Sequence, residues 1–380
     1  MKHMKKIVVA SDSFKGSLSS GEVATCCERA IRRVFPGCEV EKIPVGDGGE
    51  GTADALVEAS QGRRVECMAR DPLTRPVRAS YGISGDGRTA VIEMAAASGL
   101  TLLSPGERNP LLTTTLGTGD LIRDALDRGC REFLVCIGGS ATNDAGMGML
   151  QALGFRFLGS DGEELGQGGM QLEKVRAIDD TGRLPQLAET RFTVACDVDN
   201  PFCGEQGAAY VFGRQKGADD AMIRRLDNGL RHFADLIAST RHIDLNAIPG
   251  SGAAGGLGGG FVALLGARLK PGIDMVLDTL RFDERIKGAD LIITGEGRLD
   301  SQTLMGKTPF GVLHAGTRQG IPVIAIGGSV ESEERLIEAG FTALFPIQPA
   351  PLSLEEALRP AVARHNIERT VEMIMRTLKI

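Results

Sequence analysis

Six glycine-rich or acidic segments directly follow short apolar runs that predict buried strands. These segments are 11–17, 47–52, 138–144, 197–200, 295–300 and 327–329. In open α/β sheets, ligands bind outside the carboxyl ends of the strands, where glycines free backbone N–H groups and a following helix N-terminus favours an anion. Ordinary βα turns use the same residue types. Six such segments, with several carboxylates and a few cations, nevertheless favour a phosphate or carboxylate site.

Two aspartates in one of these segments have the spacing of a chemical pair. Asp197 and Asp199 are two residues apart, so both carboxylates face the same side of an extended strand end. Such a pair could hold Mg²⁺, or one member could act as a general base toward a hydroxyl group. The alternative is structural, namely an Asx turn combined with the N-cap of a following helix.

Charged residues of both signs alternate in the predicted loop 295–300. Its members are Glu296, Arg298 and Asp300. A guanidinium group suits a transferred phosphoryl group and carboxylates suit a metal, whereas the alternative is a local ion pair. Lys15 follows another predicted strand, where it either pairs with an anion or is a solvated surface lysine.

Two patterns resemble nucleotide-binding motifs but lack the required context. Residues 250–255 fit G-x-G-x-x-G, yet the segment before them is a poor strand, and a dinucleotide site requires a strand there. Residues 301–308 end in Gly-Lys-Thr, but Ser301 stands where a P-loop needs glycine. Lys307 is still expected near phosphate, because it stands at a predicted helix start. The five histidines have no metal-ligand spacing and no G-x-S-x-G elbow is present, so zinc chemistry and triad hydrolysis are not supported.

The composition excludes several classes of partner. The chain has 380 residues and a formal net charge of −6, and concentrated positive charge is absent, so neither nucleic acid nor an anionic membrane is an expected partner. Eight cysteines without framework spacing predict reduced, buried thiols and a cytoplasmic location. The sequence contains no run of 18 apolar residues, so we expect no membrane span. Glycine, at 51 of 380 residues, is nearly twice its usual share of about 7% and indicates many tight turns.

The order of predicted elements indicates an α/β protein with two domains. The chain begins strand–helix–strand–helix, and Ser19 and Glu22 stand at capping-box spacing before the first helix. Consecutive strands then interrupt this rhythm, with a hairpin turn at 84–87. Strand–helix alternation returns near residue 288.

We therefore predict a Rossmann-like, doubly wound parallel sheet built from both termini, with a second α/β domain inserted. The first domain comprises residues 1–75 and 285–380, and the inserted domain comprises residues 76–284.

Nine short motifs occur in order between Ser11 and Lys307. They read SDSFKGS, GDGGEGT, IEMAAASGL, RNPLLTTTLGTG, IGGSATNDAGMGMLQALG, ACDVDNP, FGRQKGA, GAAGGLGGG and ITGEGRLDSQTLMGK. Together they resemble the bacterial glycerate kinase family, and as an ordered set they are highly specific. One mild departure is Ala145, where many members of the family have glycine.

The resemblance implies ATP-dependent phosphorylation of the small molecule D-glycerate with Mg²⁺, in the cleft between two α/β domains. The 2-hydroxyl is the expected acceptor, because the family contains 2-kinases, and transfer to the 3-hydroxyl is the alternative. The alternatives to this function are a kinase for another small hydroxy acid and a non-catalytic sensor that binds such an acid.

This chemistry assigns a role to each candidate residue. One of Asp197 and Asp199 deprotonates the glycerate hydroxyl and the other helps to hold Mg²⁺, while Lys15 and Arg298 face the substrate carboxylate or the moving phosphoryl group. The expected substrate-binding residues are Asp47, Gly48, Gly49, Ser140, Thr142, Asn143 and Asp144. Gly295, Gly297 and Lys307 are expected near the nucleotide phosphates, and Glu296 or Asp300 near the metal.

Overall fold

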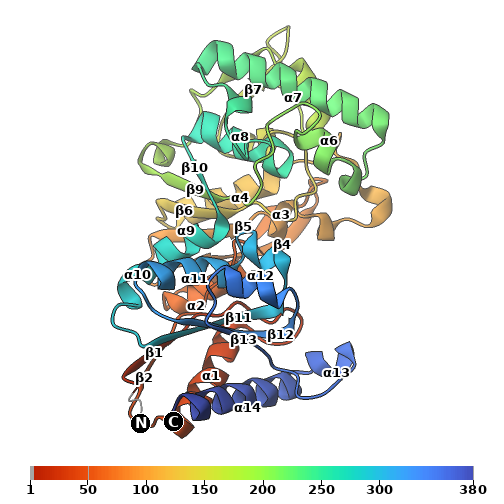
Figure 1. Ribbon diagram of the computed structural model, residues 1–380. Coiled ribbons are helices and arrows are strands. Elements are labelled where there is room, and N and C mark those ends of the chain that lie inside the picture. Colours follow the sequence, from red (N-terminus) through yellow and green to blue (C-terminus); the bar gives the residue numbers. More distant parts are fainter. Residues whose placement is uncertain (1–3, 50, 380) are drawn as a thin grey trace. The chain divides into compact units, whose positions relative to one another are not determined.

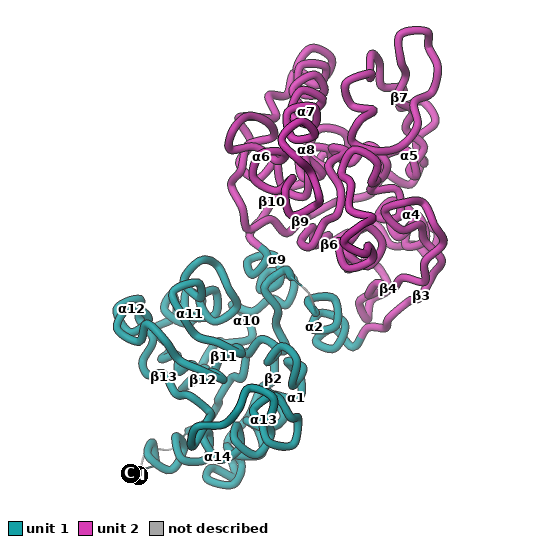
Figure 2. Tube along the Cα trace, turned by 90° about the vertical axis from the view of Figure 1, so that its right-hand side faces the viewer, with its two compact units in different colours: residues 1–61, 272–380 teal, residues 62–271 magenta. Residues whose placement is uncertain are grey.

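The computed structural model describes residues 4–49 and 51–379 and divides the chain into two compact units. Unit 1 comprises residues 1–61 and 272–380, and unit 2 comprises residues 62–271 (Figure 2). Both units combine helices with largely parallel strands, so the predicted α/β class is confirmed.

A five-stranded parallel sheet forms the centre of unit 1. Its strands are β1 (Lys6–Val9), β2 (Glu39–Lys42), β11 (Leu291–Leu299), β12 (Val323–Val330) and β13 (Ala343–Pro346). They lie in the order β13-β12-β11-β1-β2, so both ends of the chain contribute to one sheet (Figure 1). Strand β1 has its successor β2 on one side and the distant β11 on the other. The strand order therefore reverses between β1 and β11.

Helices cover both faces of this sheet. They are α1 (Ser20–Val34), α2 (Thr52–Ala59), α9 (Gly272–Thr279), α10 (Phe282–Arg285), α11 (Thr308–Arg318), α12 (Glu333–Glu338), α13 (Leu354–Leu358) and α14 (Pro360–Leu378). Ile7 and Val9 of β1 share one buried cluster with apolar residues of α1 and α14. Helix α11 covers the opposite face, where Gly316 lies against Ile292 and Val323. This division follows from the alternation of side chains along each strand.

The start of α1 is the predicted capping box. The Ser19 hydroxyl oxygen accepts from the backbone N–H of Glu22 at 3.3 Å, and the backbone N–H of Ser19 donates to the Glu22 carboxylate at 2.9 Å. These two bonds satisfy N–H groups that a helix start otherwise leaves unpaired. The two bonds also fix the end of the segment between β1 and α1, because the helix begins directly after Ser19.

Unit 2 is built on a six-stranded mixed sheet. Its strands are β3 (Arg63–Arg70), β4 (Pro76–Ile83), β5 (Thr89–Glu93), β6 (Glu132–Cys136), β9 (Arg191–Ala195) and β10 (Arg268–Lys270), in the order β10-β9-β6-β5-β4-β3. The pairs from β10 to β5 are parallel, whereas β5, β4 and β3 are antiparallel to one another in turn. The backbone bond from Ser84 N–H to the Thr89 carbonyl, at 3.0 Å, closes the predicted hairpin.

Helices and a small ribbon complete unit 2. The helices are α3 (Ala95–Ser98), α4 (Leu116–Asp127), α5 (Met147–Ala152), α6 (Ala208–Phe212), α7 (Asp220–Arg241) and α8 (Ala253–Leu265), and the ribbon pairs β7 (Arg156–Leu158) with β8 (Ala177–Asp179). Phenylalanine rings stack through the core, with ring centroids 5.0 Å apart for Phe133 and Phe192 and 5.7 Å apart for Phe192 and Phe261. Such tilted aromatic pairs add to the stability gained from area burial alone.

The unit boundaries differ from those expected near residues 75 and 285. Strand β3 pairs with β4 along its whole length, from Arg63 opposite Ile83 to Arg70 opposite Pro76, and so belongs to unit 2. Helices α9 and α10 belong to unit 1, where Ile273 packs against Gly311 of α11. Strand pairing and helix packing, which the order of elements along the chain does not reveal, therefore set the unit boundaries.

The structure also bears on the motif at 250–255, on the eight cysteines and on the predicted absence of a membrane span. The G-x-G-x-x-G match at 250–255 follows a 3₁₀ helix at Leu245–Ala247 instead of a strand, so the decision to discount it is confirmed. All eight cysteines are free thiols. Among residues 4–49 and 51–379, no helix has the length and apolar character that crossing a bilayer demands.

Candidate active site

The carboxyl ends of β1 and β11 meet where the strand order of unit 1 reverses. The backbone N–H of Ala10 donates to the Ile293 carbonyl at 2.8 Å, and that of Asp12 donates to the Gly295 carbonyl at 2.9 Å. The segment that follows β1 therefore runs beside the later part of β11. Open α/β sheets bind their ligands at this switch point.

The glycine-rich segment after Thr294 is an extension of β11 and not the predicted loop. Glu296 pairs with Gly327 of β12, and Arg298 pairs with Ser329. A Cβ atom on Gly295 would lie 2.4 Å from the Ile326 carbonyl oxygen, so this glycine allows close strand packing, and its phosphate contact stays a prediction. The loop prediction failed here because glycine runs are typical of turns, whereas neighbouring strands can also require them.

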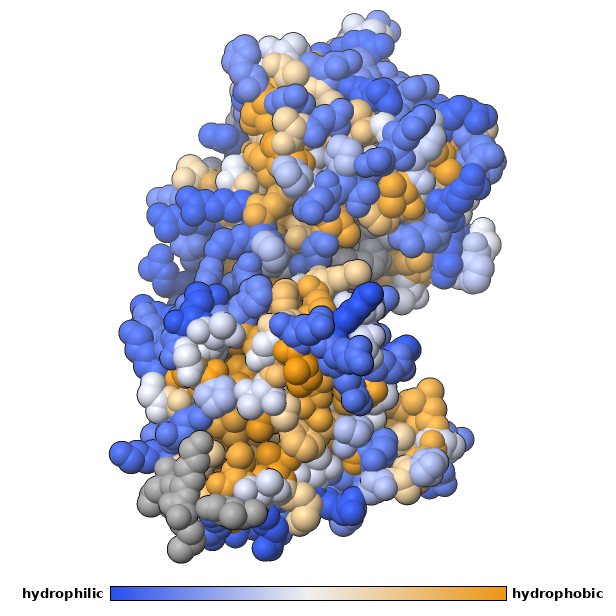
Figure 3. Space-filling model, in the orientation of Figure 1, coloured by the Kyte–Doolittle hydropathy of each residue, from blue (hydrophilic) through white to orange (hydrophobic). Residues whose placement is uncertain are grey.

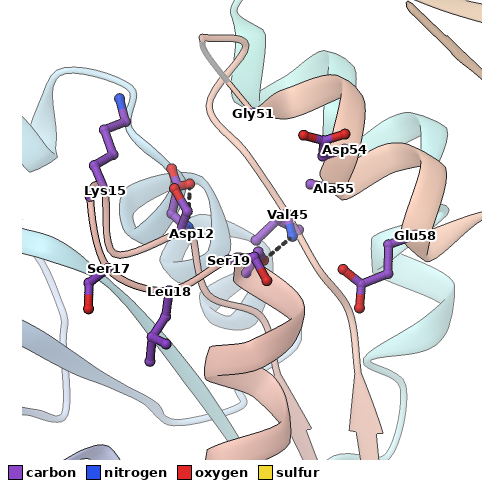
Figure 4. A pocket seen from close by; sticks show the side chains of 13 residues that line it. Asp12, Lys15, Ser17, Leu18, Ser19, Val45, Gly51, Asp54, Ala55 and Glu58 are labelled. Carbon is purple, nitrogen blue, oxygen red and sulfur yellow. Dashed lines mark hydrogen bonds between the residues drawn. The ribbon is translucent and has the colours of Figure 1, made fainter. Parts of the chain in front are cut away.

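Two cavities open at this edge of unit 1. The larger, of about 550 Å³, is lined on its polar side by Asp12, Lys15, Asp47, Glu296, Gly297, Arg298 and Lys307. The smaller, of about 360 Å³, shares Asp12 and Lys15 with it and adds Asp54 and Glu58 of α2. Figure 4 shows Asp12 in the smaller cavity between Lys15 on one side and the α2 carboxylates on the other. The two cavities thus meet at Asp12 and Lys15.

Asp12 lines both cavities, and it is a candidate residue to which the sequence analysis assigned no role. Its side chain is buried; one carboxylate oxygen accepts from the Thr308 hydroxyl at 2.9 Å and the other accepts from the backbone N–H of Ser13 at 2.6 Å. Burial, and then the nearby charge of Asp47, raise the pKa of Asp12 to about 6, although the two hydrogen bonds and Lys15 act in the opposite direction. The available signal was its place as the first acidic residue after β1.

Lys307 and Glu296 form an ion pair at the wall of the larger cavity. Their nitrogen and oxygen atoms are 3.3 Å apart, and the second Glu296 oxygen accepts from the Thr303 hydroxyl at 2.6 Å. Burial raises the pKa of Glu296. Lys307 immediately precedes α11, so it stands at the positive end of that helix as predicted.

Arg298 takes part in the local ion pairs that were the structural alternative. Its guanidinium lies 3.2 Å from Asp300 and 2.7 Å from Glu331. Asp300 also accepts from the backbone N–H of Gln302 at 2.8 Å and is not among the residues that line the larger cavity. The structure therefore gives Asp300 a local structural task, and its metal role stays a prediction.

The backbone N–H groups of the loop 47–49 form hydrogen bonds with side chains of the same turn. The backbone N–H of Gly48 donates to the Thr52 hydroxyl at 3.0 Å, and that of Gly49 donates to the Asp47 carboxylate at 3.0 Å. These are the N–H groups that were expected to bind glycerate hydroxyls. In the structure they close the turn before α2, while Asp47 itself lines the larger cavity, and the contacts of all three residues with glycerate stay predictions.

Asp197 and Asp199 lie in unit 2, directly after β9, and both are exposed. The next helix, α6, has Gly207 as its N-cap, so neither aspartate caps a helix. That part of the structural alternative is wrong. Their predicted roles toward the hydroxyl and the metal stay predictions.

The predicted substrate-binding residues 140–144 are enclosed in unit 2. Thr142, Asn143 and Asp144 are fully buried, and Ser140 nearly so. The Asp144 carboxylate accepts bonds from the backbone and hydroxyl of Thr115, the Thr114 hydroxyl and the backbone N–H groups of Gly146 and Gly148. These bonds give Asp144 a structural task, and its substrate contact stays a prediction.

A buried lysine completes this polar cluster. The Lys216 ammonium donates to the Thr142 carbonyl at 2.7 Å. Burial lowers the pKa of Lys216 to about 7, an effect that the charge of Asp144 opposes, and burial raises the pKa of Asp144. Both groups are thus held closer to neutrality than in water.

The carboxylates that line the larger cavity are the candidates for holding a metal. Among residues 4–49 and 51–379, no three His, Cys, Asp or Glu side chains form a group that could hold an ion. Asp12 and Asp47 line one cavity together with Lys15 and Lys307. Mg²⁺ is commonly held by one or two carboxylates together with substrate phosphates. This donor set is of the kind that can hold Mg²⁺ together with phosphate oxygens, at the sheet edge of an α/β unit.

Comparison with known proteins identifies the family. The glycerate kinase family model matches residues 7–379. The chain is 49% identical to the glycerate kinase of Bacillus cereus and 46% identical to the glycerate 2-kinase of Escherichia coli K12, in each case over 99% of this chain and 98% of the relative. A crystal structure assigned as glycerate kinase 2 of Salmonella typhimurium LT2 matches with a TM-score of 0.92 and 47% identity, over 99% of this chain and 98% of that one. The chain belongs to the glycerate kinase family, and the resemblance inferred from the motifs is confirmed.

The burial of Asp12 predicts a distinctive pH dependence of stability. Because its pKa rises from 3.8 in the unfolded chain to about 6 in the folded one, the folded state binds the proton more tightly, and this group's contribution to the free energy of unfolding falls as pH increases from about 4 to 6. We expect Asp12→Asn to be more stable than the wild type at pH 7.5, by about 1–3 kcal/mol. Urea denaturation at pH 4.5 and 7.5 measures this difference. The exposed Glu338→Gln is the control, and a variant less stable than the wild type at pH 7.5 would contradict the expectation.

Asp144 predicts a loss of stability when it is truncated. Asp144→Ala leaves buried donors without an acceptor, each at a cost of about 1–3 kcal/mol, so we expect the free energy of unfolding to fall by roughly 3 kcal/mol or more. Urea denaturation compares this variant with Asp235→Ala, which alters an exposed aspartate of α7 in the same unit. Equal midpoints for the two variants would show that the buried hydrogen bonds do not stabilise unit 2.

Proposed function

We propose that this chain catalyses the ATP-dependent phosphorylation of D-glycerate at its 2-hydroxyl. Membership of the glycerate kinase family supports the substrate, and a 46% identical relative named glycerate 2-kinase supports the position. The observation that carries the ATP part is the cavity at the switch point of unit 1. Two lysines and three carboxylates line it together, namely Lys15, Lys307, Asp12, Asp47 and Glu296.

The cations of this cavity suit a polyphosphate. Phosphoryl transfer needs positioning and charge neutralisation more than covalent chemistry. Lys15 is exposed at the rim, and Lys307 stands at the N-terminus of α11, where free N–H groups and the helix dipole add positive potential. Gly297 and Gly328 also line the cavity, so phosphate oxygens can approach backbone there.

Asp12 and Asp47 are the carboxylates best placed for Mg²⁺. The bonds from Thr308 and Ser13 hold the Asp12 carboxylate in place, and Asp47 is close enough for its charge to raise the pKa of Asp12. When bound, Mg²⁺ supplies the charge neutralisation of the terminal phosphates. Glu296 is already paired with Lys307, and so it orients that lysine toward the cavity.

The acceptor hydroxyl needs a group that takes its proton. Asp197 and Asp199 keep the role predicted from their spacing, in which one carboxylate accepts the proton as the hydroxyl oxygen bonds to the γ-phosphorus. The bond between that phosphorus and the bridging oxygen breaks, and ADP leaves with the bridging oxygen. The exposure of both carboxylates supports this role, because a proton acceptor must reach its substrate.

Of the two alternatives, the non-catalytic sensor fits the cavity less well. A sensor that only binds a hydroxy acid gains nothing from Asp12, Asp47 and Glu296 in its pocket, because their charges repel a second carboxylate. A kinase for another small hydroxy acid would use the same groups. Competing turnover of glycerate, glycolate, lactate and tartronate separates these cases.

The proposed product predicts a specific phosphorus spectrum. Wild-type enzyme with Mg²⁺, ATP and D-glycerate is expected to form ADP and 2-phosphoglycerate, whose phosphorus couples to a single carbon-bound hydrogen and gives a doublet in ³¹P NMR. A triplet, from coupling to a CH₂ group, would identify 3-phosphoglycerate and overturn the assigned position. Absence of ADP and of any phosphoglycerate would overturn the proposed activity itself.

The proton acceptor predicts a kinetic loss. One of Asp197→Asn and Asp199→Asn is expected to lower kcat by about 10²–10⁴-fold, because a positioned base contributes on that order. Steady-state assays with D-glycerate and ATP compare both with Asp235→Asn, the exposed α7 control. If both variants keep the kcat of the wild type, neither aspartate is the base.

A further inference from the structure

The larger cavity of unit 1 has a second, apolar side that phosphates do not need. Ile347, Leu352, Leu354 and Leu358 line it, opposite in character to the lysines and carboxylates described above. Ligand cavities are commonly lined by apolar side chains with a few polar groups. A ligand that fills this cavity must therefore carry both a charged and an apolar part.

The leucines are exposed and yet held in place. Leu352 is 42% exposed and Leu354 is 75% exposed. Ser353, between them, caps the short helix α13: its hydroxyl oxygen accepts from the backbone N–H of Glu356, and its own N–H donates to the Glu356 carboxylate, both at 3.3 Å. The cap presents the two leucines as a defined surface. Figure 3 shows apolar atoms gathered where Figure 1 places α13.

The apolar side adjoins the phosphate side through direct contact. A Cβ atom on Gly16 would lie 3.8 Å from a methyl group of Leu358, so α13 touches the turn that carries Lys15. Gly297 and Gly328 line the same cavity without side chains. A single ligand can therefore extend from the lysines to the leucines over bare backbone.

One amide group among these apolar residues is already oriented. The Gln348 side-chain oxygen accepts from the Asn366 amide at 2.9 Å, and Asn366 is buried in α14. This bond leaves the two N–H groups of the Gln348 amide for a ligand. A donor of this kind matches the ring nitrogens at the edge of a heteroaromatic base.

We infer that the apolar side is the base-binding slot of a purine nucleoside triphosphate. The leucines and Ile347 cover the faces of the ring, Gln348 donates to its edge, and Lys15 and Lys307 bind the phosphates. A cavity of about 550 Å³ has the size usual for a ligand of this kind. The inference rests on the proposed function, since ATP is the one reactant that joins a polyanion to an apolar ring.

Serine substitutions test the slot without adding charge. In Leu352→Ser/Leu354→Ser, competition against a fluorescent ADP analogue followed by anisotropy is expected to show at least tenfold weaker binding of MgADP. The affinity for inorganic triphosphate, which has no base, is expected to stay within threefold of the wild type. Ile337→Ser, at an exposed apolar residue of α12 that does not line the cavity, is the matched control and is expected to bind both as the wild type does.

Lys307→Ala provides the opposite pattern, because it is expected to weaken ADP and triphosphate together. Since both leucines are exposed, the double serine variant is expected to melt within about 2 °C of the wild type. Unchanged ADP binding in that variant, or an equal loss for ADP and triphosphate, overturns the slot. If the wild type phosphorylates glycerate while the double serine variant binds ADP as tightly as the wild type, the base-binding slot is wrong and the proposed function stands. Wild type that binds ADP through the leucines but makes no phosphoglycerate contradicts the proposed function alone.

Discussion

The hydrogen bond between Thr308 and Asp12 is the interaction on which the unit 1 site depends. It joins residues 296 positions apart in the chain, one at the end of β1 and the other at the first turn of α11. The same bond keeps a carboxylate buried beside another carboxylate, Asp47, in a position that burial alone disfavours. Through it, the segment after β1 and the helix that follows Lys307 present opposite charges to one cavity.

Two glycines shape that cavity because they have no side chains. Strands β11 and β12 continue past their apolar cores, and Gly297 and Gly328 approach so closely that a Cβ on Gly328 would lie 2.4 Å from the Gly297 carbonyl oxygen. A floor of bare backbone results, with charged side chains on one side and leucines on the other. Glycine in a strand interior weakens the strand, and a ligand that approaches the backbone is a common reason for it.

The surroundings of two buried carboxylates, Asp144 in unit 2 and Asp12 in unit 1, differ. Asp144 in unit 2 is saturated with protein donors and closed to solvent, so it stabilises the chain around it. Asp12 in unit 1 is nearly as buried, but it lines two cavities and lies near another carboxylate. The Asp144 carboxylate is fully paired with protein donors, whereas the Asp12 carboxylate remains next to a second negative charge, an arrangement typical of functional sites.

The sequence by itself determined the fold class, the parallel sheet shared by both termini, the capping box of α1 and the family, because these depend on local periodicity and on motifs read in order. It also predicted that Lys307 meets the nucleotide phosphates, that Lys15 faces the substrate carboxylate or the moving phosphoryl group, and that Asp47 binds glycerate hydroxyls. Only the tertiary structure decided that Asp12 lines the same cavity as these three residues. It also decided that the N–H groups of Gly48 and Gly49 form hydrogen bonds within their own turn, and that Asp144 is buried. The physical reason is that burial and hydrogen-bond partners arise from residues far apart in the chain, so one residue type can serve either a turn, a core or a ligand.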